Sequence, residues 1–364
     1  MGFACGIVGL PNVGKSTLFN AITSAGIAAE NYPFCTIEPN TGVVPVPDLR
    51  LKWLSESFKT QREVPTTIEF VDIAGLVRGA AAGEGLGNQF LGHIRTVDAV
   101  AHVVRCFEDD NVIHVDHTVD PIRDIETVET ELILKDLDTV QKRIDTASRR
   151  LKTNDKEAKE EIEVADRLLK HLAAGHLAIT FERTERELEL TREHHLLTDK
   201  PVMYIANTDE DGLVNGNALI ERVREYATPR GFKVVPVCAK IEAEIAELPF
   251  EERSAFLESL GLNEPGLNAI IRTGYELLGL VTFFTAGEKE CRAWTVRKGA
   301  TAPEAAGVIH TDFQRGFIRA EVQSYDDLRR LGSEQAVKEA GLYRVEGKDY
   351  VTKDGDVMFF RFNV

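Results

Sequence analysis

The sequence contains few cysteines, and these follow no pairing pattern. They are odd in number, scattered along the chain and without a C-x-x-C pair. The five are Cys5, Cys35, Cys106, Cys238 and Cys291. Such a distribution argues against a disulfide-stabilised scaffold and indicates reduced, mostly buried thiols.

Positive charge is also scarce, since 43 Lys and Arg face 59 Asp and Glu, giving a net charge of -16. An acidic chain of this kind does not coat nucleic acid nonspecifically, although a local basic face can still form. No apolar run approaches the length of a membrane span, and the first expected strand begins at once, without a cationic signal region. We therefore expect a cytoplasmic protein that makes no membrane contact.

A phosphate-binding motif is the most informative feature that the chain does contain. Residues 9–17, GLPNVGKST, fit G-x-x-x-x-G-K-[ST] and lie between a strand-like stretch, 3–8, and a helix-like stretch, 18–25. Glycines allow backbone N–H groups to converge on a phosphate, and the helix N-terminus adds its positive dipole. A chance glycine turn would not bring strand, loop and helix together. The residues expected to bind nucleotide here are Asn12, Val13, Gly14, Lys15, Ser16 and Thr17.

Within this loop and further along the chain, the side chains that phosphoryl transfer needs can be assigned. Lys15 would neutralise the β- and γ-phosphates, and Ser16 would place its hydroxyl on Mg²⁺. A strand-like stretch, 67–71, delivers Asp72 and Gly75 in a D-x-x-G motif, which offers an acid to the Mg²⁺ shell and an N–H to the γ-phosphate. Thr36 is the candidate for a further Mg²⁺ ligand. We thus expect metal ligation by Ser16, Thr36 and Asp72.

Base recognition is expected at the ends of two later strands, 201–206 and 233–237. Asn207 would tie its loop to the phosphate loop, Thr208 would lie against the base, and N–H groups near Ala239 would meet the exocyclic edge. In guanine-specific relatives an N-K-x-D motif supplies a lysine and an aspartate, where this chain has Thr208 and Glu210. The longer Glu210 side chain disrupts paired acceptance from guanine. We therefore predict that ATP binds in preference to GTP.

An insertion separates the motifs, because Asp72 and Asn207 lie 135 positions apart where a minimal domain needs roughly 60. Residues 125–197 are densely charged, poor in Gly and Pro, and apolar at helical spacing, which predicts two long antiparallel helices joined near residues 153–155. Basic side chains recur along one face of this arm, and they favour either RNA contact or plain solvation. They are Lys142, Arg143, Arg149, Arg150 and Lys152.

The order of motifs at strand ends predicts an α/β fold with a doubly wound P-loop core. With 364 residues, 43% of them hydrophobic, the chain can bury more than one core. After residue 281 short β-rich runs replace the long helices, which predicts a small α+β domain whose role is docking. The expected division is 1–124 with 198–280 as nucleotide-binding domain, 125–197 as inserted helical arm, and 281–364 as C-terminal domain.

These motifs together resemble the YchF family of Obg-related P-loop proteins, also called Obg-like ATPases. The resemblance extends to residues 31–36, 79–88 and the C-terminal run 313–321, FQRGFIRAE, and covers essentially the whole chain. It implies a C-terminal β-grasp domain of the TGS type, ATP hydrolysis and association with the ribosome, both rRNA and ribosomal proteins. We expect a monomer.

One departure from the general GTPase plan concerns the attacking water. Leu76 follows Gly75 where many relatives hold a glutamine, and a leucine cannot hydrogen-bond water. His114, in the loop after the strand 99–106, is the nearest alternative within the chain, although a loop histidine can also be merely solvated. Whether K⁺ near Asn12 assists is left open. A noncatalytic nucleotide sensor that regulates a protein partner stays as the alternative function, and phosphate release would separate the two.

Overall fold

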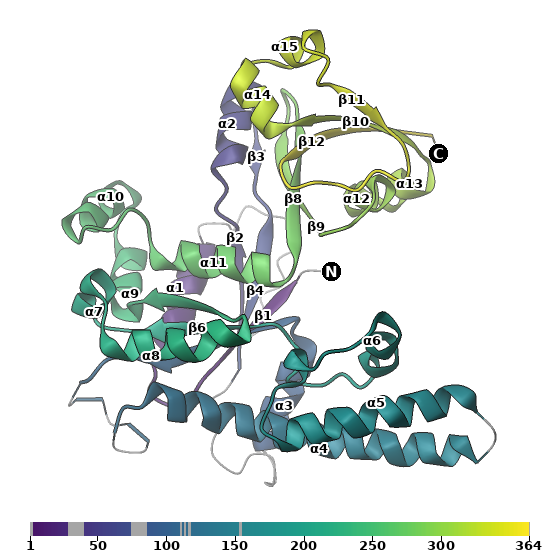
Figure 1. The fold of residues 1–364 in the computed structure, drawn as a ribbon. Coiled ribbons are helices and arrows are strands. Elements are labelled where there is room, and N and C mark those ends of the chain that lie inside the picture. Colours follow the sequence, from purple (N-terminus) through teal and green to yellow (C-terminus); the bar gives the residue numbers. More distant parts are fainter. Residues whose placement is uncertain are drawn as a thin grey trace. The chain divides into compact units, whose positions relative to one another are not determined.

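The computed structural model describes residues 3–27, 40–73, 86–109, 111–112, 114–115, 118–152 and 155–363 (Figure 1). The chain forms two compact units. The first comprises Met1–Val43 and Glu69–Thr273, and the second Val44–Ile68 and Gly274–Val364. In the described part of the chain, no helix is long and apolar enough to cross a membrane.

A six-stranded sheet forms the centre of the first unit, in the order β2-β4-β1-β5-β6-β7. Its strands are β1 (Ala4–Val8), β2 (Thr41–Pro45), β4 (Thr67–Asp72), β5 (Ala99–Arg105), β6 (Val202–Asn207) and β7 (Lys233–Val237). From β4 to β7 all neighbouring strands run parallel. Every residue of β5 is buried, as expected for a strand covered on both faces. The predicted α/β fold is confirmed.

Helices connect these strands, so that the motifs lie at strand ends. Between strands of this sheet lie α1 (Lys15–Ile27), α3 (Leu86–Thr96), α7 (Glu210–Asn215) and α8 (Ala218–Ala227), whereas α9 (Ala239–Glu247), α10 (Phe250–Ser259) and α11 (Gly266–Leu277) follow β7. Ile220 and Val223 of α8 are buried against Tyr204 of β6 in one apolar cluster. The helix faces therefore complete the core around the sheet.

Two long helices, α4 (Pro121–Leu151) and α5 (Lys156–Ala173), form the predicted inserted arm and lie side by side in Figure 1. Asp120 and Asp155 cap their N-termini by accepting backbone N–H bonds. Val140 of α4 packs with Leu168 and Leu172 of α5, which buries the apolar stripe of each helix. The 3-10 helix η1 (Ala178–Thr180) and α6 (Glu185–Arg192) follow, and α6 is a third helix that was not predicted.

The second unit contains another six-stranded sheet, in the order β11-β10-β12-β8-β9-β3. Its strands are β3 (Glu63–Val64), β8 (Leu280–Ala286), β9 (Cys291–Arg297), β10 (Phe317–Ser324), β11 (Arg344–Glu346) and β12 (Asp356–Phe362). Its helices are α2 (Leu49–Ser57), α12 (Ala302–Ile309), α13 (Thr311–Arg315), α14 (Tyr325–Leu331) and α15 (Glu334–Glu339). Val351 makes an isolated bridge with Thr301, and β12 is the last strand in chain order.

Residues 44–68 belong to this second unit, whereas the predicted division assigned them to the nucleotide-binding domain. Leu51 and Leu54 of α2 are buried in a cluster with Phe284 and Tyr325. Val64 of β3 pairs with Arg292 of β9. The apolar face of α2 thus finds its partners more than two hundred residues away, which explains why sequence order alone misplaces this segment.

Candidate functional site

The predicted phosphate loop lies between β1 and α1. Gly14 adopts a backbone φ of +90°, and a Cβ built at this position would lie 2.1 Å from Nδ2 of Asn207. Only glycine fits both conditions. Asn12 also has a positive φ, of 63°. Ser16 and Thr17 are exposed in the first turn of α1, where hydroxyl and N–H groups can meet an anion.

Lys15 joins this loop to the end of β4. Its Nζ lies 3.1 Å from Oδ1 of Asp72 and donates to the carbonyl of Ile73 at 2.9 Å. The pairing is possible because Ile7 of β1 is in register with Asp72 of β4. The Lys15 side chain is nearly buried, at 9% exposure. The Lys15 ammonium group therefore lies beside Asp72, the residue that the sequence predicts as a metal ligand. A cation at this place can neutralise the charge of a triphosphate.

Asn207 links the phosphate loop to the base loop. Its Nδ2 donates to the carbonyl of Val13 at 2.8 Å, and its Oδ1 accepts from the N–H of Ala239 at 3.0 Å. Asn207 is buried at the end of β6. The structure thus brings the expected tie together. Because Asn207 already accepts from the N–H of Ala239, a bound base would have to contact another group nearby.

Thr208 and Glu210 differ in accessibility. Thr208 is 2% exposed, its hydroxyl lies 3.3 Å from the carbonyl of Cys106, and it accepts from Nδ2 of Asn217 at 2.9 Å. Glu210 is exposed at the start of α7, behind the helix cap formed by Asp209. The Thr208 side chain therefore orders the loop from inside, whereas Glu210 is accessible from solvent.

Some predicted positions lie outside the described residues. These are Thr36, the candidate metal ligand, and Gly75 with the following Leu76 of the D-x-x-G segment. Asp72 and Ser16 are the two predicted metal ligands that the structure describes. Both belong to the phosphate-loop end of the sheet, and both remain predictions as ligands.

His114 is buried rather than presented to solvent. Its ring is 4% exposed, and its Nε2 lies 2.8 Å from Oδ2 of Asp124, which is 1% exposed in the first turn of α4. Asp124 also receives Nη2 of Arg123, 3.3 Å from its Oδ1. Burial raises the pKa of the nearby Cys106 thiol to about 12, with a second contribution from the negative charge of Asp124. The sequence reasoning did not identify Asp124, because no motif marks it.

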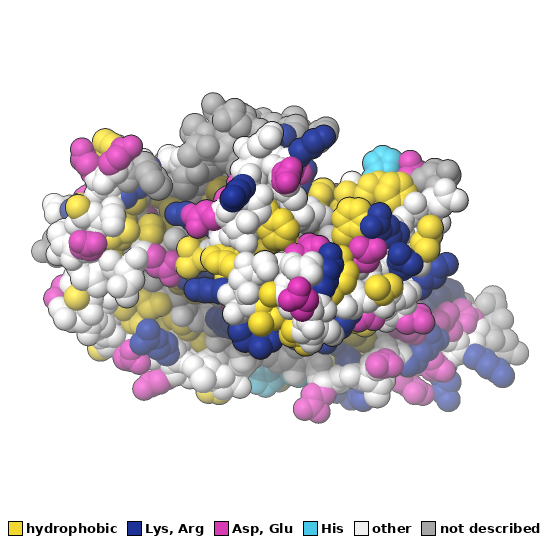
Figure 2. Space-filling view, turned by 90° about the horizontal axis from the view of Figure 1, so that it is seen from above, with side chains coloured by type: hydrophobic (Ala, Val, Ile, Leu, Met, Phe, Trp, Pro, Cys, Tyr) yellow, Lys and Arg dark blue, Asp and Glu magenta, His cyan; other side chains and the backbone are white. Residues whose placement is uncertain are grey.

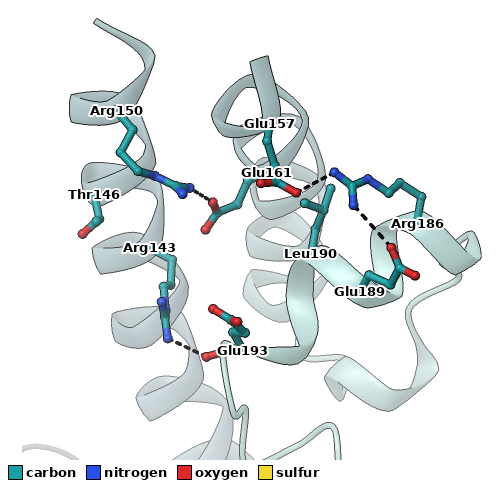
Figure 3. Close-up of a pocket in the computed structure, with 9 residues that line it drawn as sticks. All are labelled: Arg143, Thr146, Arg150, Glu157, Glu161, Arg186, Glu189, Leu190 and Glu193. Atoms are coloured by element: carbon teal, nitrogen blue, oxygen red, sulfur yellow. Dashed lines mark hydrogen bonds and ion pairs between the residues drawn. The ribbon is translucent and has the colours of Figure 1, made fainter. Parts of the chain in front are cut away.

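Basic side chains on the arm are largely matched by local acceptors. Arg150 pairs with Glu161, Arg143 donates to the backbone carbonyl of Glu193, and Lys142 pairs with Asp138 at 2.8 Å. Figure 3 shows the two arginines on α4 facing acidic residues of α5 and the segment after α6, around a cavity of about 340 Å³. The predicted basic stripe is therefore partly neutralised within the arm.

The visible face in Figure 2 carries interspersed basic, acidic and hydrophobic side chains rather than a single basic patch. In the second unit Val345 and Phe359 are 62% and 53% exposed. Arg361 stacks over the Phe359 ring, 4.4 Å from its centroid, and pairs with Glu321.

Comparisons with known proteins connect these features. Residues 4–142 match a family model described as "50S ribosome-binding GTPase", and residues 280–363 match the model YchF-GTPase_C, described as "Protein of unknown function (DUF933)". The chain is 59% identical to the "Ribosome-binding ATPase YchF" of Haemophilus influenzae over 364 residues, with all of both chains covered. The protein of that name from Bacillus subtilis is 56% identical over 366 residues, again with full coverage.

A solved structure of the Schizosaccharomyces pombe YchF GTPase superposes with a TM-score of 0.89 at 38% identity, covering 99% of this chain and 98% of that one. The likeness thus includes the P-loop core, the α4–α5 insert and the C-terminal β-rich unit. Since sequence and fold agree along the whole length, the chain belongs to the YchF family.

Proposed function

We propose that this protein is a ribosome-associated ATPase that hydrolyses ATP, and GTP less readily, to ADP and phosphate and acts as a nucleotide-dependent switch in translation. The observation that carries the proposal is the ion pair between Lys15 of the P-loop and Asp72. The adjacent Gly14 lies so close to the side chain of Asn207 that no Cβ would fit between them. The names of the full-length relatives, as ribosome-binding ATPases, supply the partner and the nucleotide.

Each described group has a role in this proposal. Lys15 would leave its present partners to contact the β- and γ-phosphates, while Asn207 keeps the phosphate and base loops in register. Ser16 and Asp72, with Thr36, would hold Mg²⁺, which supplies neutralisation of phosphate charge. Gly75 would donate its N–H to the γ-phosphate. Positioning and electrostatics of this kind account for most of catalysis in phosphoryl transfer.

The cellular setting and the assembly state form part of the same proposal. We place the protein in the cytosol as a monomer, with residues 125–197 as an inserted arm and residues 281–364 as the C-terminal domain. K⁺ is an open element, and turnover measured in K⁺ against Na⁺ buffer tests whether a monovalent cation near Asn12 takes part.

The decisive experiment measures phosphate release with Mg²⁺, with and without ribosomes. Because a group that orients water acts mainly in the transition state, His114→Ala should lower turnover about tenfold or more and leave nucleotide affinity nearly intact. His93→Ala, at an exposed position on α3, is the matched control and should change neither quantity.

Equal turnover in the His114→Ala variant and the parent would remove His114 from the mechanism. Absence of phosphate release under every condition, with tight nucleotide binding retained, would favour the alternative of a noncatalytic nucleotide sensor.

A further inference from the structure

The base loop, residues 207–210, is bonded by a side chain that follows it in the chain. Asn217 lies half-buried between α7 and α8. Its Nδ2 donates to the carbonyl of Cys106 at 2.8 Å and to the hydroxyl of Thr208 at 2.9 Å. Its Oδ1 accepts from the N–H of Ile220 at 2.8 Å and thereby caps α8. Both donors of this amide are therefore committed, one to the end of β5 and one to the base loop.

The bond from Asn217 is the shortest that the Thr208 hydroxyl makes. The other two are longer, at 3.3 Å to the carbonyl of Cys106 and 3.4 Å to Oδ1 of Asp209. Because Asn217 donates to this hydroxyl, the hydroxyl proton points to one of those two acceptors. The backbone N–H of Thr208 donates to the carbonyl of Val237, the last residue of β7, at 2.8 Å. Thus β7 fixes the backbone of Thr208, and Asn217 fixes the direction of its side chain.

A glycine of α7 leaves the room in which these two side chains meet. Gly212 is buried, and a Cβ built there would lie 2.2 Å from Oγ1 of Thr208 and 2.6 Å from Nδ2 of Asn217. Its own N–H donates to Oδ1 of Asp209 at 2.8 Å. The polar ends of Thr208 and Asn217 therefore occupy the space that a larger residue would fill. The conformation of the base loop thus depends on close polar contacts.

We propose that Asn217 is a positioning residue for nucleotide binding, which holds Thr208 against the end of β5 and so orders the base loop before a purine arrives. The inference rests on the proposed function, in which Asn207, Thr208 and Glu210 bind the base. A loop that is already ordered loses less conformational entropy when the ligand binds. The bonds of Asn217 given above lead to β5, the base loop and α8, so its effect should be confined to the base end of the nucleotide.

The test is Asn217→Ser in the full chain, with binding measured by titration calorimetry in Mg²⁺ buffer. Serine caps a helix about as well as asparagine, but it is too short to reach Thr208 and Cys106. The Kd for ATP should rise about fivefold or more, because the loop must then be ordered on binding. Inorganic tripolyphosphate, which has no base, should bind within about twofold of the parent. KM for ATP should rise with Kd, while kcat changes by less than about twofold.

Two further variants isolate the contact. Asn215→Ser alters an exposed asparagine of α7 whose Nδ2 bonds to Oδ1 of Asp211 at 2.8 Å, and it should change neither the Kd for ATP nor the melting temperature. Thr208→Val removes the hydroxyl and keeps the side-chain shape. Combined with Asn217→Ser, it should raise Kd by less than the product of the separate effects, because both changes break the same bond.

The outcomes separate this inference from the function on which it rests. If folded Asn217→Ser binds ATP as tightly as the parent, or if tripolyphosphate weakens as much as ATP, the inference is overturned and the ATPase proposal stands. Full multiplication of the Thr208→Val and Asn217→Ser effects would overturn it too. If melting curves show that Asn217→Ser does not fold, Thr208→Val decides alone, and an unchanged Kd for ATP refutes the inference. A parent chain that binds no ATP would remove the proposed function itself.

Discussion

Three residues, Gly14, Lys15 and Asn207, connect the ends of β1, β4 and β6 at the nucleotide site. Gly14 leaves room for Asn207, whose side chain then bonds to the carbonyl of Val13, while Lys15 reaches across to Asp72. None of these contacts contributes to the apolar core. Substitutions here should therefore affect ligand binding far more than folding.

Lys15→Ala and Ser16→Ala provide the direct test at this scale. Both side chains are expected to face the ligand, so nucleotide or Mg²⁺ affinity should fall at least about tenfold, as loss of a hydrogen bond to a charged group costs about 1.5–3 kcal/mol. Binding of a fluorescent nucleotide, beside a melting curve, measures both effects. Unchanged affinity in both variants would contradict the site.

Base choice is the second prediction for single residues. Guanine recognition needs two well-placed acceptors, and the exposed Glu210 replaces the usual aspartate with a longer side chain. Loss of that paired acceptance costs on the order of 1–3 kcal/mol per bond, so ATP should bind in preference to GTP by about tenfold or more. Glu210→Asp alone should restore little, because Thr208 also differs and is committed to Cys106 and Asn217.

Competition of ATP and GTP for one labelled nucleotide measures this preference. GTP binding tighter than ATP would refute our interpretation of the base loop, whatever the turnover of either nucleotide.

At the scale of elements, the arm is attached to the core region by buried polar contacts as well as by apolar packing. Asp136 of α4 is 1% exposed and accepts from the N–H groups of Leu197 and Thr198 and from the Thr198 hydroxyl. Burial raises the pKa of this carboxyl, although the three bonds oppose the shift. The residues after α6 are thereby held against α4.

Asp136→Asn should destabilise the protein by about 1–3 kcal/mol, because one amide oxygen cannot satisfy three donors and its NH₂ group would face N–H groups. Asp138→Asn is the matched control on the same helix. Its carboxylate is exposed and pairs only with lysines, so the loss should stay below about 0.5 kcal/mol. Urea unfolding of the three proteins compares them. Equal stability of both variants would show that the Asp136 contacts carry no net energy.

At the scale of the whole molecule, charge is unevenly distributed. Residues 281–364 contain thirteen Lys and Arg and thirteen Asp and Glu, so the net charge of -16 resides entirely in the rest of the chain. An acidic molecule can approach RNA only where positive side chains gather locally. The basic residues of the arm, Lys142, Arg143, Arg149, Arg150 and Lys152, are the predicted place for such a contact.

Association with ribosomes should therefore weaken as salt rises, and it should weaken further when Arg149 and Arg150 are both changed to Glu. Since Arg150 pairs with Glu161, the matched control is the swap Arg150→Glu with Glu161→Arg, which restores the internal pair. Co-sedimentation at graded salt measures the effect. If the complex is insensitive to salt and unaffected by the charge reversal, the ribosomal contact is made with protein or through the C-terminal unit instead.

Local patterns in the sequence determined much of the core and of the site. The phosphate loop, Asp72 and Asn207 each follow a strand-like run, and parallel strands place such ends at one edge of the sheet. Helical spacing likewise predicted α4 and α5. These features depend on neighbours a few residues away, so composition and period are sufficient to identify them.

Only the tertiary structure decided which groups meet and which are hidden. Asn207 bonds to a carbonyl 194 positions away, and α2 packs with Phe284 rather than with the nucleotide-binding core. The tertiary structure also directs the Thr208 hydroxyl toward the carbonyl of Cys106 and pairs His114 with Asp124. Accessibility and pairing arise from the packing of distant segments. A sequence motif therefore names the chemistry of a side chain, while the fold decides whether that side chain is available.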